Sequence, residues 1–206
     1  MTTIYLIRHG QASFGAKSYD QLSPNGELQA KLLGQYFNRI LKEEPYVVTG
    51  SMQRHQQTAH LAVAECFSET NIITDSAWNE FNHQQVFAQY EPRFNEPHLL
   101  KQEVENQPDP RAHLAKIFER AIGRWTDGDF HHEYDESWPD FKNRVETALQ
   151  NLCDELAKTK PRYAVVFTSG GVISVAAGKL LELNANRTFA LNWAICNASI
   201  TTLRGQ

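Results

Sequence analysis

Short apolar runs recur along the 206-residue chain, and each has the length of a β-strand. They occupy positions 4–7, 46–50, 72–74, 163–168 and 199–203, and most are rich in Val, Ile, Tyr, Phe and Thr. Runs of this composition that are bounded by polar or glycine-containing turns predict strands. The run at 163–168 is apolar almost throughout, which is typical of a parallel strand covered on both faces.

Helical periodicity fills the intervals between these runs. Ser23 suits the N-cap and Pro24 the first position of a helix that we expect to reach about Glu44, where Pro45 ends it. Its apolar positions form two sets, Leu28, Leu32, Tyr36 and Ile40, and Leu33, Phe37 and Leu41. Similar spacing predicts helices over 51–67, 114–125, 136–156 and 172–183, and a short one near 187–190. Alternating strands and helices predict an α/β fold, a three-layer sandwich with a mostly parallel central sheet and helices on both faces.

The pattern loosens between Glu80 and about Ser137. The prolines at 92, 97, 108 and 110 interrupt it, and the helix over 114–125 is its one clear element. We therefore interpret 1–206 as a single domain that carries a cap-like insertion at about 81–137. Such a cap, packed over the edge of the sheet, is a candidate for substrate selection, and a role in packing alone is the alternative.

Composition narrows the classes of protein. Twenty Lys and Arg against 24 Asp and Glu give a net charge of −4, and the absence of a basic tail or stripe argues against nucleic-acid binding. The three cysteines are widely spaced, which argues against a disulfide framework or a zinc knuckle. We find neither an apolar run of membrane-spanning length nor a leader segment, so we expect a soluble cytoplasmic protein with no membrane partner. The oligomeric state stays open, with a homodimer among the alternatives.

Candidate chemistry follows three of the predicted strands. The first strand ends on Arg8, His9 and Gly10, Arg54 lies early in the helix after the second, and Gly170 begins the helix after the strand at 163–168. Guanidinium groups bind pairs of phosphoryl oxygens, and a helix N-terminus also favours an anion. Two nearby cations would lower the pKa of the His9 imidazole and keep it neutral and nucleophilic.

Six segments, in their order along the chain, resemble the histidine phosphatase superfamily, which includes the cofactor-dependent phosphoglycerate mutases. They are Leu-Ile-Arg-His-Gly at 6–10, the segments 22–30 and 51–59, Glu80 after Trp78-Asn79, Glu136-Ser137 with Arg144-Val145, and the strand–Gly170-Gly171–helix turn. The resemblance covers nearly the whole chain. It implies a phosphoglycerate mutase-like fold and phosphoryl transfer without a metal or another cofactor.

The same resemblance assigns roles to individual residues. It implies that His9 is the nucleophile that forms a phosphohistidine, and that Glu80 is the acid that protonates the leaving oxygen. It implies that Arg8, Arg54, Ser169 and Gly170 bind the phosphate. The glycine that often follows the acid in the family is absent, and Phe81-Asn82-His83 stands there instead.

The main departure from the family pattern is Ser169, which stands where the family has a second histidine that donates a hydrogen bond to the phosphoryl group. A hydroxyl also donates but carries no charge. Loss of one such donor costs about 10²–10³ in rate, so we expect phosphate binding to survive better than turnover. His83 is a hypothetical replacement for the missing imidazole. We interpret His55 and His60 as surface or packing residues, and His131-His132 as a solvated loop rather than a metal site.

These observations favour hydrolysis of a small phosphomonoester through a phosphohistidine on His9, at a reduced rate. Two alternatives stay open. A mutase would return the phosphoryl group to another hydroxyl, and the segment from 81 to 137 does not resemble that of a phosphoglycerate mutase. A pseudoenzyme would bind a phosphorylated ligand or a partner protein without turning it over, as the exchange to Ser169 allows.

Overall fold

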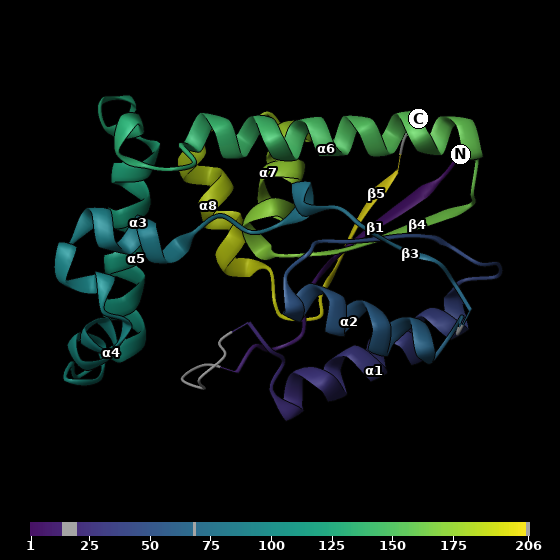
Figure 1. The fold of residues 1–206 in the computed structure, drawn as a ribbon, viewed down its shortest axis with the longest axis horizontal. Helices are drawn as coiled ribbons and strands as arrows, with labels where there is room; N and C mark the ends of the chain where they lie inside the picture. The colour runs from purple at the N-terminus through teal and green to yellow at the C-terminus, as the bar shows by residue number, and fades with distance from the viewer. Residues whose placement is uncertain (14–19, 68, 205–206) are drawn as a thin grey trace. The chain divides into compact units, whose positions relative to one another are not determined.

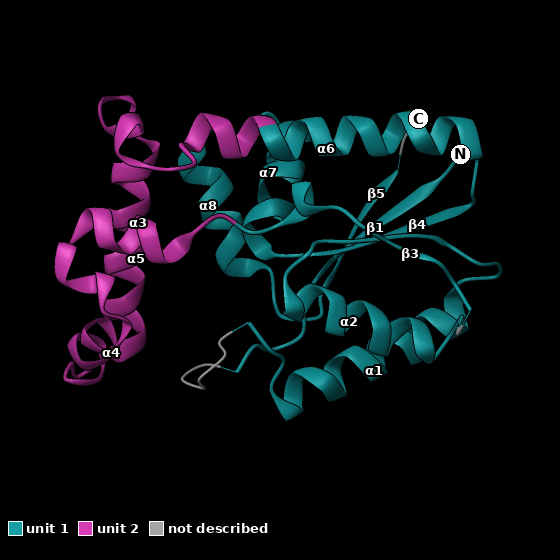
Figure 2. Cartoon of the chain, viewed as in Figure 1, with its two compact units in different colours: residues 1–80, 144–206 teal, residues 81–143 magenta. Residues whose placement is uncertain are grey.

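The chain forms two compact units in the computed structural model, which describes residues 1–13, 20–67 and 69–204. The first unit comprises 1–80 and 144–206, and the second comprises 81–143 (Figure 2). The second unit contains the segment for which the sequence predicts a cap-like insertion at about 81–137 within a single domain. That it acts as a cap and selects the substrate stays a prediction.

One sheet runs through the first unit. Within the described residues it has five strands in the order β3-β2-β4-β1-β5. They are β1 (Thr3–Arg8), β2 (Tyr46–Thr49), β3 (Ile72–Thr74), β4 (Tyr163–Thr168) and β5 (Ile200–Arg204). The first four are parallel to one another, and β5 pairs with β1 in the antiparallel sense. The carboxyl ends of β1, β2 and β4 therefore meet at one edge of the sheet.

Helices cover both faces of this sheet (Figure 1). Helices α1 (Pro24–Ile40) and α2 (Gln53–Ala64) lie on one face, and the part of α6 (Trp138–Thr159) that follows Arg144 lies on the other with α7 (Gly170–Leu180). Helix α8 (Ala185–Ala194) packs on α7. The core between the sheet and the first two helices includes Ile7, Phe37, Val47, Ala59, Ala62, Val165 and Phe167. The predicted three-layer α/β fold is confirmed.

Helix α1 begins as predicted but ends early. The Ser23 hydroxyl accepts a hydrogen bond from the Gly26 N–H at 3.1 Å, and Pro24 occupies the first turn. The helix stops at Ile40, before the predicted end at about Glu44, because Leu41 takes an extended conformation while its N–H still bonds to the Phe37 carbonyl.

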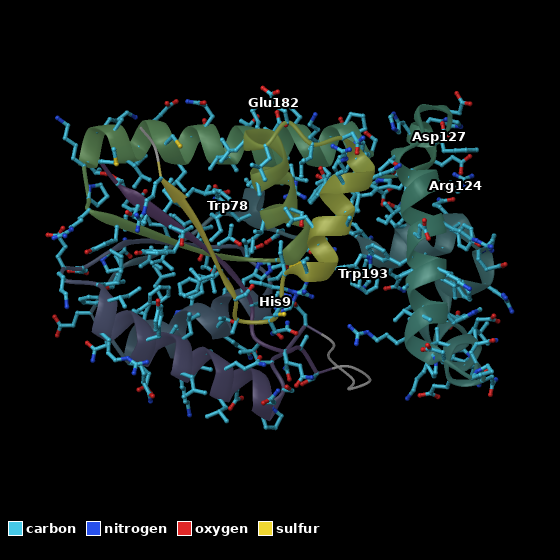
Figure 3. All side chains as sticks on the ribbon, turned by 180° about the vertical axis from the view of Figure 1, so that it is seen from behind. His9, Trp78, Arg124, Asp127, Glu182 and Trp193 are labelled. Carbon is cyan, nitrogen blue, oxygen red and sulfur yellow. The ribbon has the colours of Figure 1, made fainter. Side chains whose placement is uncertain are left out.

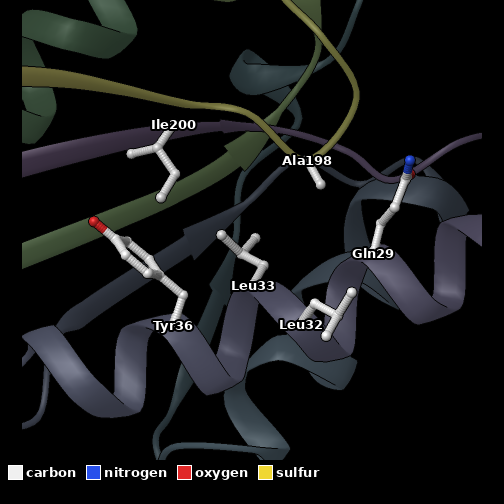
Figure 4. Close-up of a pocket in the computed structure, with 6 residues that line it drawn as sticks. All are labelled: Gln29, Leu32, Leu33, Tyr36, Ala198 and Ile200. Carbon is white, nitrogen blue, oxygen red and sulfur yellow. The ribbon is translucent and has the colours of Figure 1, made fainter.

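Only one of the two apolar sets on α1 belongs to the core. Leu33, Phe37 and Leu41 are buried, whereas Leu28, Leu32 and Tyr36 are each about half exposed. Helical spacing alone picks out both sets, and the structure shows that the set of Leu33, Phe37 and Leu41 is the one that faces the core. Part of this outer surface borders a groove of about 360 Å³ between α1 and β5 (Figure 4). Its lining consists of Gln29, Leu32, Leu33, Tyr36, Ala198 and Ile200. None of the candidate site residues lines it.

Two other helix boundaries also differ from prediction. Helix α2 begins after Ser51, because the Ser51 side chain and backbone N–H are both bonded to the Asn79 side chain, at 2.7 Å each. Met52 therefore becomes the N-cap, without a side-chain bond. Helix α7 starts at Gly170 and ends at Leu180, so it lies earlier in the chain than the predicted 172–183. The glycine amide thus belongs to the first turn of α7.

The second unit is helical. It contains α3 (His83–Tyr90), α4 (Pro97–Glu105), α5 (Pro110–Thr126) and the first residues of α6. Pro97 and Pro110, which we interpreted as interruptions, instead occupy the first turns of α4 and α5, where a missing N–H costs nothing. Phe81 stacks on Trp125 at 4.7 Å between ring centroids and packs edge-on against Phe141 at 5.4 Å.

No helix in the described ranges combines the length and the apolar character that a bilayer crossing requires.

Candidate active site

His9 follows β1 directly and lies at the carboxyl edge of the sheet (Figure 3). Its backbone N–H bonds to the Thr168 carbonyl at 2.9 Å, and the next N–H, that of Gly10, bonds to the Thr58 hydroxyl at 3.0 Å. A Cβ on Gly10 would lie 2.4 Å from the Gly26 carbonyl oxygen, so only glycine fits between this loop and α1. The loop that carries His9 is thus held by β4, α2 and α1.

The hydrogen bonds of the His9 ring define its tautomer. Nδ1 lies 2.7 Å from the Gly10 carbonyl oxygen, which only accepts, so Nδ1 carries the proton. Nε2 therefore presents its lone pair, and the Arg54 Nε–H donates to it at 3.2 Å. Burial first, then the charges of Arg54 and Arg8, lower the pKa of His9 to about 3, against a smaller opposing effect of the Gly10 bond. The ring is a neutral potential nucleophile, and burial lowers its pKa more than either of the two arginines that the sequence points to.

Arg54 occupies the first turn of α2 and is only 5% exposed. Its guanidinium group also binds Asp20, with 2.6 Å between Nη1 and Oδ1. The other Asp20 oxygen accepts the backbone N–H of Gln53 at 2.8 Å. Asp20 therefore orients Arg54 and caps α2 at once. Sequence reasoning missed Asp20, because nothing in the local pattern distinguishes it from any other loop aspartate.

Arg8 reaches the start of α7. One of its terminal N–H groups donates to the Ile195 carbonyl, while its Nε is buried and has no partner among the described residues. A Cβ on Gly170 would lie 3.6 Å from the Arg8 guanidinium carbon. Arg8 and the first amide of α7 are therefore neighbours, and the buried Nε–H is a donor that suits an anion.

The turn from β4 into α7 supplies Ser169, Gly170 and Gly171. Ser169 is 1% exposed, and its hydroxyl makes no capping bond to α7. A Cβ on Gly170 would come within 2.2 Å of the Asn192 side-chain oxygen, so a larger residue here would have to displace that side chain. The N–H of Gly171 donates to Glu80 at 3.0 Å. The N-terminus of α7 thus brings Glu80 beside the predicted phosphate-binding residues.

Glu80 ends a segment that is fixed by its backbone. The Thr168 hydroxyl donates to the Trp78 carbonyl at 2.5 Å. One nitrogen of Arg144 donates to the carbonyls of Ala77 and Asn79, at 2.8 and 2.9 Å. These bonds hold the approach to Glu80 against β4 and α6, which explains why Arg144 falls among the segments of the family pattern.

His55 is a residue for which the structure excludes one of the two predicted roles. It is fully buried, its ring lies 5.6 Å from that of His9, and its Nε2 is 2.6 Å from the Ser169 hydroxyl. Of the surface and packing roles that we predicted, the surface role is excluded, and the helical phase of His55 explains why. His55 precedes Ala59 by four residues and Ala62 by seven, so it shares their core-facing side of α2.

The other histidines of interest lie in the second unit. His83 is the first residue of α3. The hypothesis that it reaches the pocket stays a prediction. His131 and His132 belong to a 3₁₀ turn, Gly128–Glu133, rather than to an irregular loop. Over the described ranges, no three His, Cys, Asp or Glu side chains are grouped as metal ligands would be.

The residues predicted for the site thus gather around the end of β1 and the start of α7. His9 contacts Arg54, Arg8 adjoins Gly170, and Glu80 bonds to the helix that Ser169 and Gly170 begin. Two guanidinium groups and a helix N-terminus favour a bound dianion. An unprotonated imidazole nitrogen beside them can attack a phosphorus atom.

Fold and site together define an α/β protein with an anion site at the carboxyl edge of its sheet. The model of the histidine phosphatase superfamily (branch 1) matches residues 4–90 and 83–206, so the chain belongs to this superfamily. Its members are phosphatases or mutases, which places the chain among the enzymes of phosphoryl transfer. No curated protein matches the sequence.

Solved structures show the same fold at low sequence identity. A phosphoglycerate mutase from Bacillus anthracis str. Sterne is similar with a TM-score of 0.65 and 17% identity, over 98% of this chain and 86% of that one. A mycobacterial glucosyl-3-phosphoglycerate phosphatase in complex with VO3 gives 0.60 and 19%, over 100% and 92%. A phosphoserine phosphatase variant from Entamoeba histolytica in complex with phosphoserine gives 0.56 and 16%, over 98% and 90%.

Proposed function

We propose that the protein hydrolyses a small phosphomonoester through a phosphohistidine on His9. The observation that carries this proposal is the state of the His9 ring, whose Nε2 is unprotonated and lies beside the Arg54 guanidinium. A nucleophilic imidazole needs an unprotonated nitrogen, and the adjacent cation neutralises the phosphoryl oxygens as the new bond forms. Mutase chemistry would use the same first step.

In the proposed first step, Arg8 and Arg54 hold the phosphoryl oxygens, and the amides that begin α7 and the Ser169 hydroxyl add donors. Nε2 of His9 attacks phosphorus, and the bond from phosphorus to the ester oxygen breaks. Glu80 gives its proton to that oxygen, since an alkoxide is a poor leaving group. The Nδ1–H bond to Gly10 stabilises the positive charge that the ring gains.

In the second step, Glu80 takes a proton from water as the water oxygen attacks phosphorus. The bond to Nε2 breaks and inorganic phosphate leaves. The scheme uses no metal or other cofactor. Because Ser169 is uncharged, we expect each step to be slower than with an imidazole donor at that position.

The proposed substrate is a small phosphorylated molecule. The names of two similar structures, a phosphatase of glucosyl-3-phosphoglycerate and one of phosphoserine, suggest small phosphate esters for a first screen. With a net charge of −4, we also propose a cytoplasmic enzyme that binds neither nucleic acid nor membrane. A homodimer stays one alternative for its oligomeric state.

The direct test compares the protein with His9→Ala on a generic aryl phosphate. His60→Ala is the matched control, because His60 lies on the exposed side of α2 and bonds to the Gln56 carbonyl within its own helix. The proposal predicts that His9→Ala abolishes the release of phosphate while His60→Ala releases it at the normal rate. Equal rates for His9→Ala and the unmodified protein would refute it.

A pseudoenzyme is the second candidate, and Ser169 is the observation that favours it. If the protein binds phosphate or vanadate at the site but releases no phosphate from any ester in the screen, this candidate replaces the first.

A further inference from the structure

Ser169 is one of the proposed phosphate donors, but the buried His55 that contacts it has no role in the proposed function as described so far. His55 enters from α2, Ser169 from the end of β4, and their side chains meet at 2.6 Å beside His9. A fully buried imidazole is an expensive choice for packing alone, because its two nitrogens both lose water. The hydrogen bond between the two side chains therefore needs a functional explanation.

The space around the His55 ring requires small neighbours. A Cβ on Gly50, at the end of β2, would lie 2.2 Å from His55 Nδ1. On the other side of the ring stands Ser169, one of the smallest polar residues. The small residues that follow β2 and β4 thus leave room for the imidazole that α2 carries.

The protonation of His55 follows from its two nitrogens. Burial first, then proximity to His9 and Arg54, holds the pKa of His55 well below its usual value, so the ring is neutral and carries one proton. Nδ1 is buried and has no partner among the described residues. A buried N–H without an acceptor is less common than a buried acceptor without a donor. The proton therefore belongs on Nε2, which donates to the Ser169 oxygen.

This arrangement fixes the direction of the Ser169 hydroxyl. A hydroxyl has one proton to give, and the His55 donor occupies one of its acceptor positions. The groups that surround the anion site are donors: the guanidinium groups of Arg8 and Arg54 and the first amides of α7. A hydroxyl that accepts from His55 is free to give its proton to an oxyanion at their centre.

We propose that His55 is a positioning residue, which donates to Ser169 and thereby makes its hydroxyl a dedicated hydrogen-bond donor to the phosphoryl group. The inference rests on the proposed function of the same site. His55 and Ser169 would thus act together as the donor. Without His55, the Ser169 hydroxyl would have no partner that directs its proton toward the phosphoryl group. His55 itself does not touch the substrate.

The test uses two substitutions of His55 whose side chains differ in length, so that only one of them reaches Ser169. In His55→Gln the amide nitrogen stands about where Nε2 was and still donates to Ser169, whereas the shorter side chain of His55→Asn cannot reach it. With an aryl phosphate, we expect His55→Asn to lower kcat and the affinity for vanadate by about tenfold to a hundredfold, with KM within about threefold. His55→Gln should recover most of the loss.

A double-substitution cycle separates positioning from packing. If His55 acts through Ser169, then His55→Asn should change kcat by less than about twofold in a protein that already carries Ser169→Ala. A packing role predicts that the two losses multiply, and that Gln and Asn behave alike. Either of these results would overturn the proposal.

The state of the ring provides a readout that does not depend on turnover. With ¹⁵N-labelled histidine, NMR should show His55 as the neutral Nε2–H tautomer, and a proton on Nδ1 would overturn the proposal even if His55→Asn fails to fold. The control His9→Ala separates a failure of the proposed function from a failure of the role proposed for His55. If His9→Ala keeps full activity, the proposed function fails; if it is inactive while His55→Asn is unimpaired, only the role of His55 fails.

Discussion

The buried state of His9 makes stability depend on pH in a way that one substitution can isolate. In the unfolded chain His9 has the ordinary pKa of 6.5, whereas in the folded protein its pKa is lowered to about 3. Between these two values the unfolded chain binds a proton that the folded protein does not. Acid therefore favours unfolding in this window, and the free energy of unfolding rises with pH until about 6.5.

The magnitude follows from the two pKa values of His9. A difference of one pKa unit corresponds to about 1.4 kcal/mol, so full titration of a single group from 6.5 to about 3 amounts to roughly 5 kcal/mol. At pH 5 about 2 kcal/mol of this has been lost, and at pH 7.5 almost none. The lowered pKa of His55 acts in the same direction and should add to the total.

The assay is denaturant unfolding of the protein and of His9→Gln at pH 7.5, 6 and 5. Contributions from carboxylates and from the exposed histidines are common to both proteins and cancel in the difference. We expect the stability advantage of the original protein over His9→Gln to fall by about 2 kcal/mol from pH 7.5 to 5. If the two proteins show the same pH dependence, His9 is not held neutral by the fold, and the reasoning about its nucleophilicity fails.

Three further predictions concern the surroundings of His9, and a fourth concerns Gly123 in the second unit. Asp20→Asn removes a negative charge beside the anion site but keeps an acceptor for the α2 amide, so calorimetry should show about fivefold tighter binding of inorganic phosphate, as about 1 kcal/mol of removed repulsion implies. Ser169→His alone places a second ring against that of His55 and should lower the melting temperature, while adding His55→Ala should restore it and raise kcat above that of the original protein. Gly10→Ala forces a Cβ against backbone at 2.4 Å and should lower the unfolding free energy by about 2 kcal/mol or more. Gly123→Ala, whose Cβ meets nothing within 4 Å on an exposed helix position, should instead raise it by about 0.5–1 kcal/mol in the same denaturant titration.

The sheet was predictable because its strands are continuous apolar runs, and the ends of these runs mark the strand boundaries closely. The faces of α1 were less predictable. Its apolar residues cover much of its circumference, and periodicity alone does not say which of Leu32 and Leu33 meets the sheet. Folded proteins leave many apolar side chains exposed, so Leu32 at 54% exposure breaks no rule. The short helix α4 was missed because a proline such as Pro97 opens a helix as readily as it interrupts one.

In the site, the sequence indicated the residues that match a motif and missed those that only the fold brings close. Arg54 and His9 are 45 residues apart, and the motif alone paired them. Asp20 reaches Arg54 from a loop, which no periodic pattern describes. The sequence left open whether His55 lies on the surface or packs in the interior. Its burial is explained by two neighbours, Gly50 five residues before it and Ser169, which lies 114 residues further along the chain.

The claim at the centre of this account is that His9 becomes phosphorylated during turnover. The most direct measurement is rapid quenching of the protein with an excess of aryl phosphate, followed by mass spectrometry of the peptide that carries residues 1–13. The account predicts an acid-labile gain of one phosphoryl group on His9 that forms within the first turnover and is absent from His9→Ala. If phosphate is released while His9 stays unmodified at every quench time, with decay of the phosphoryl group slow enough to trap it, the central claim is contradicted.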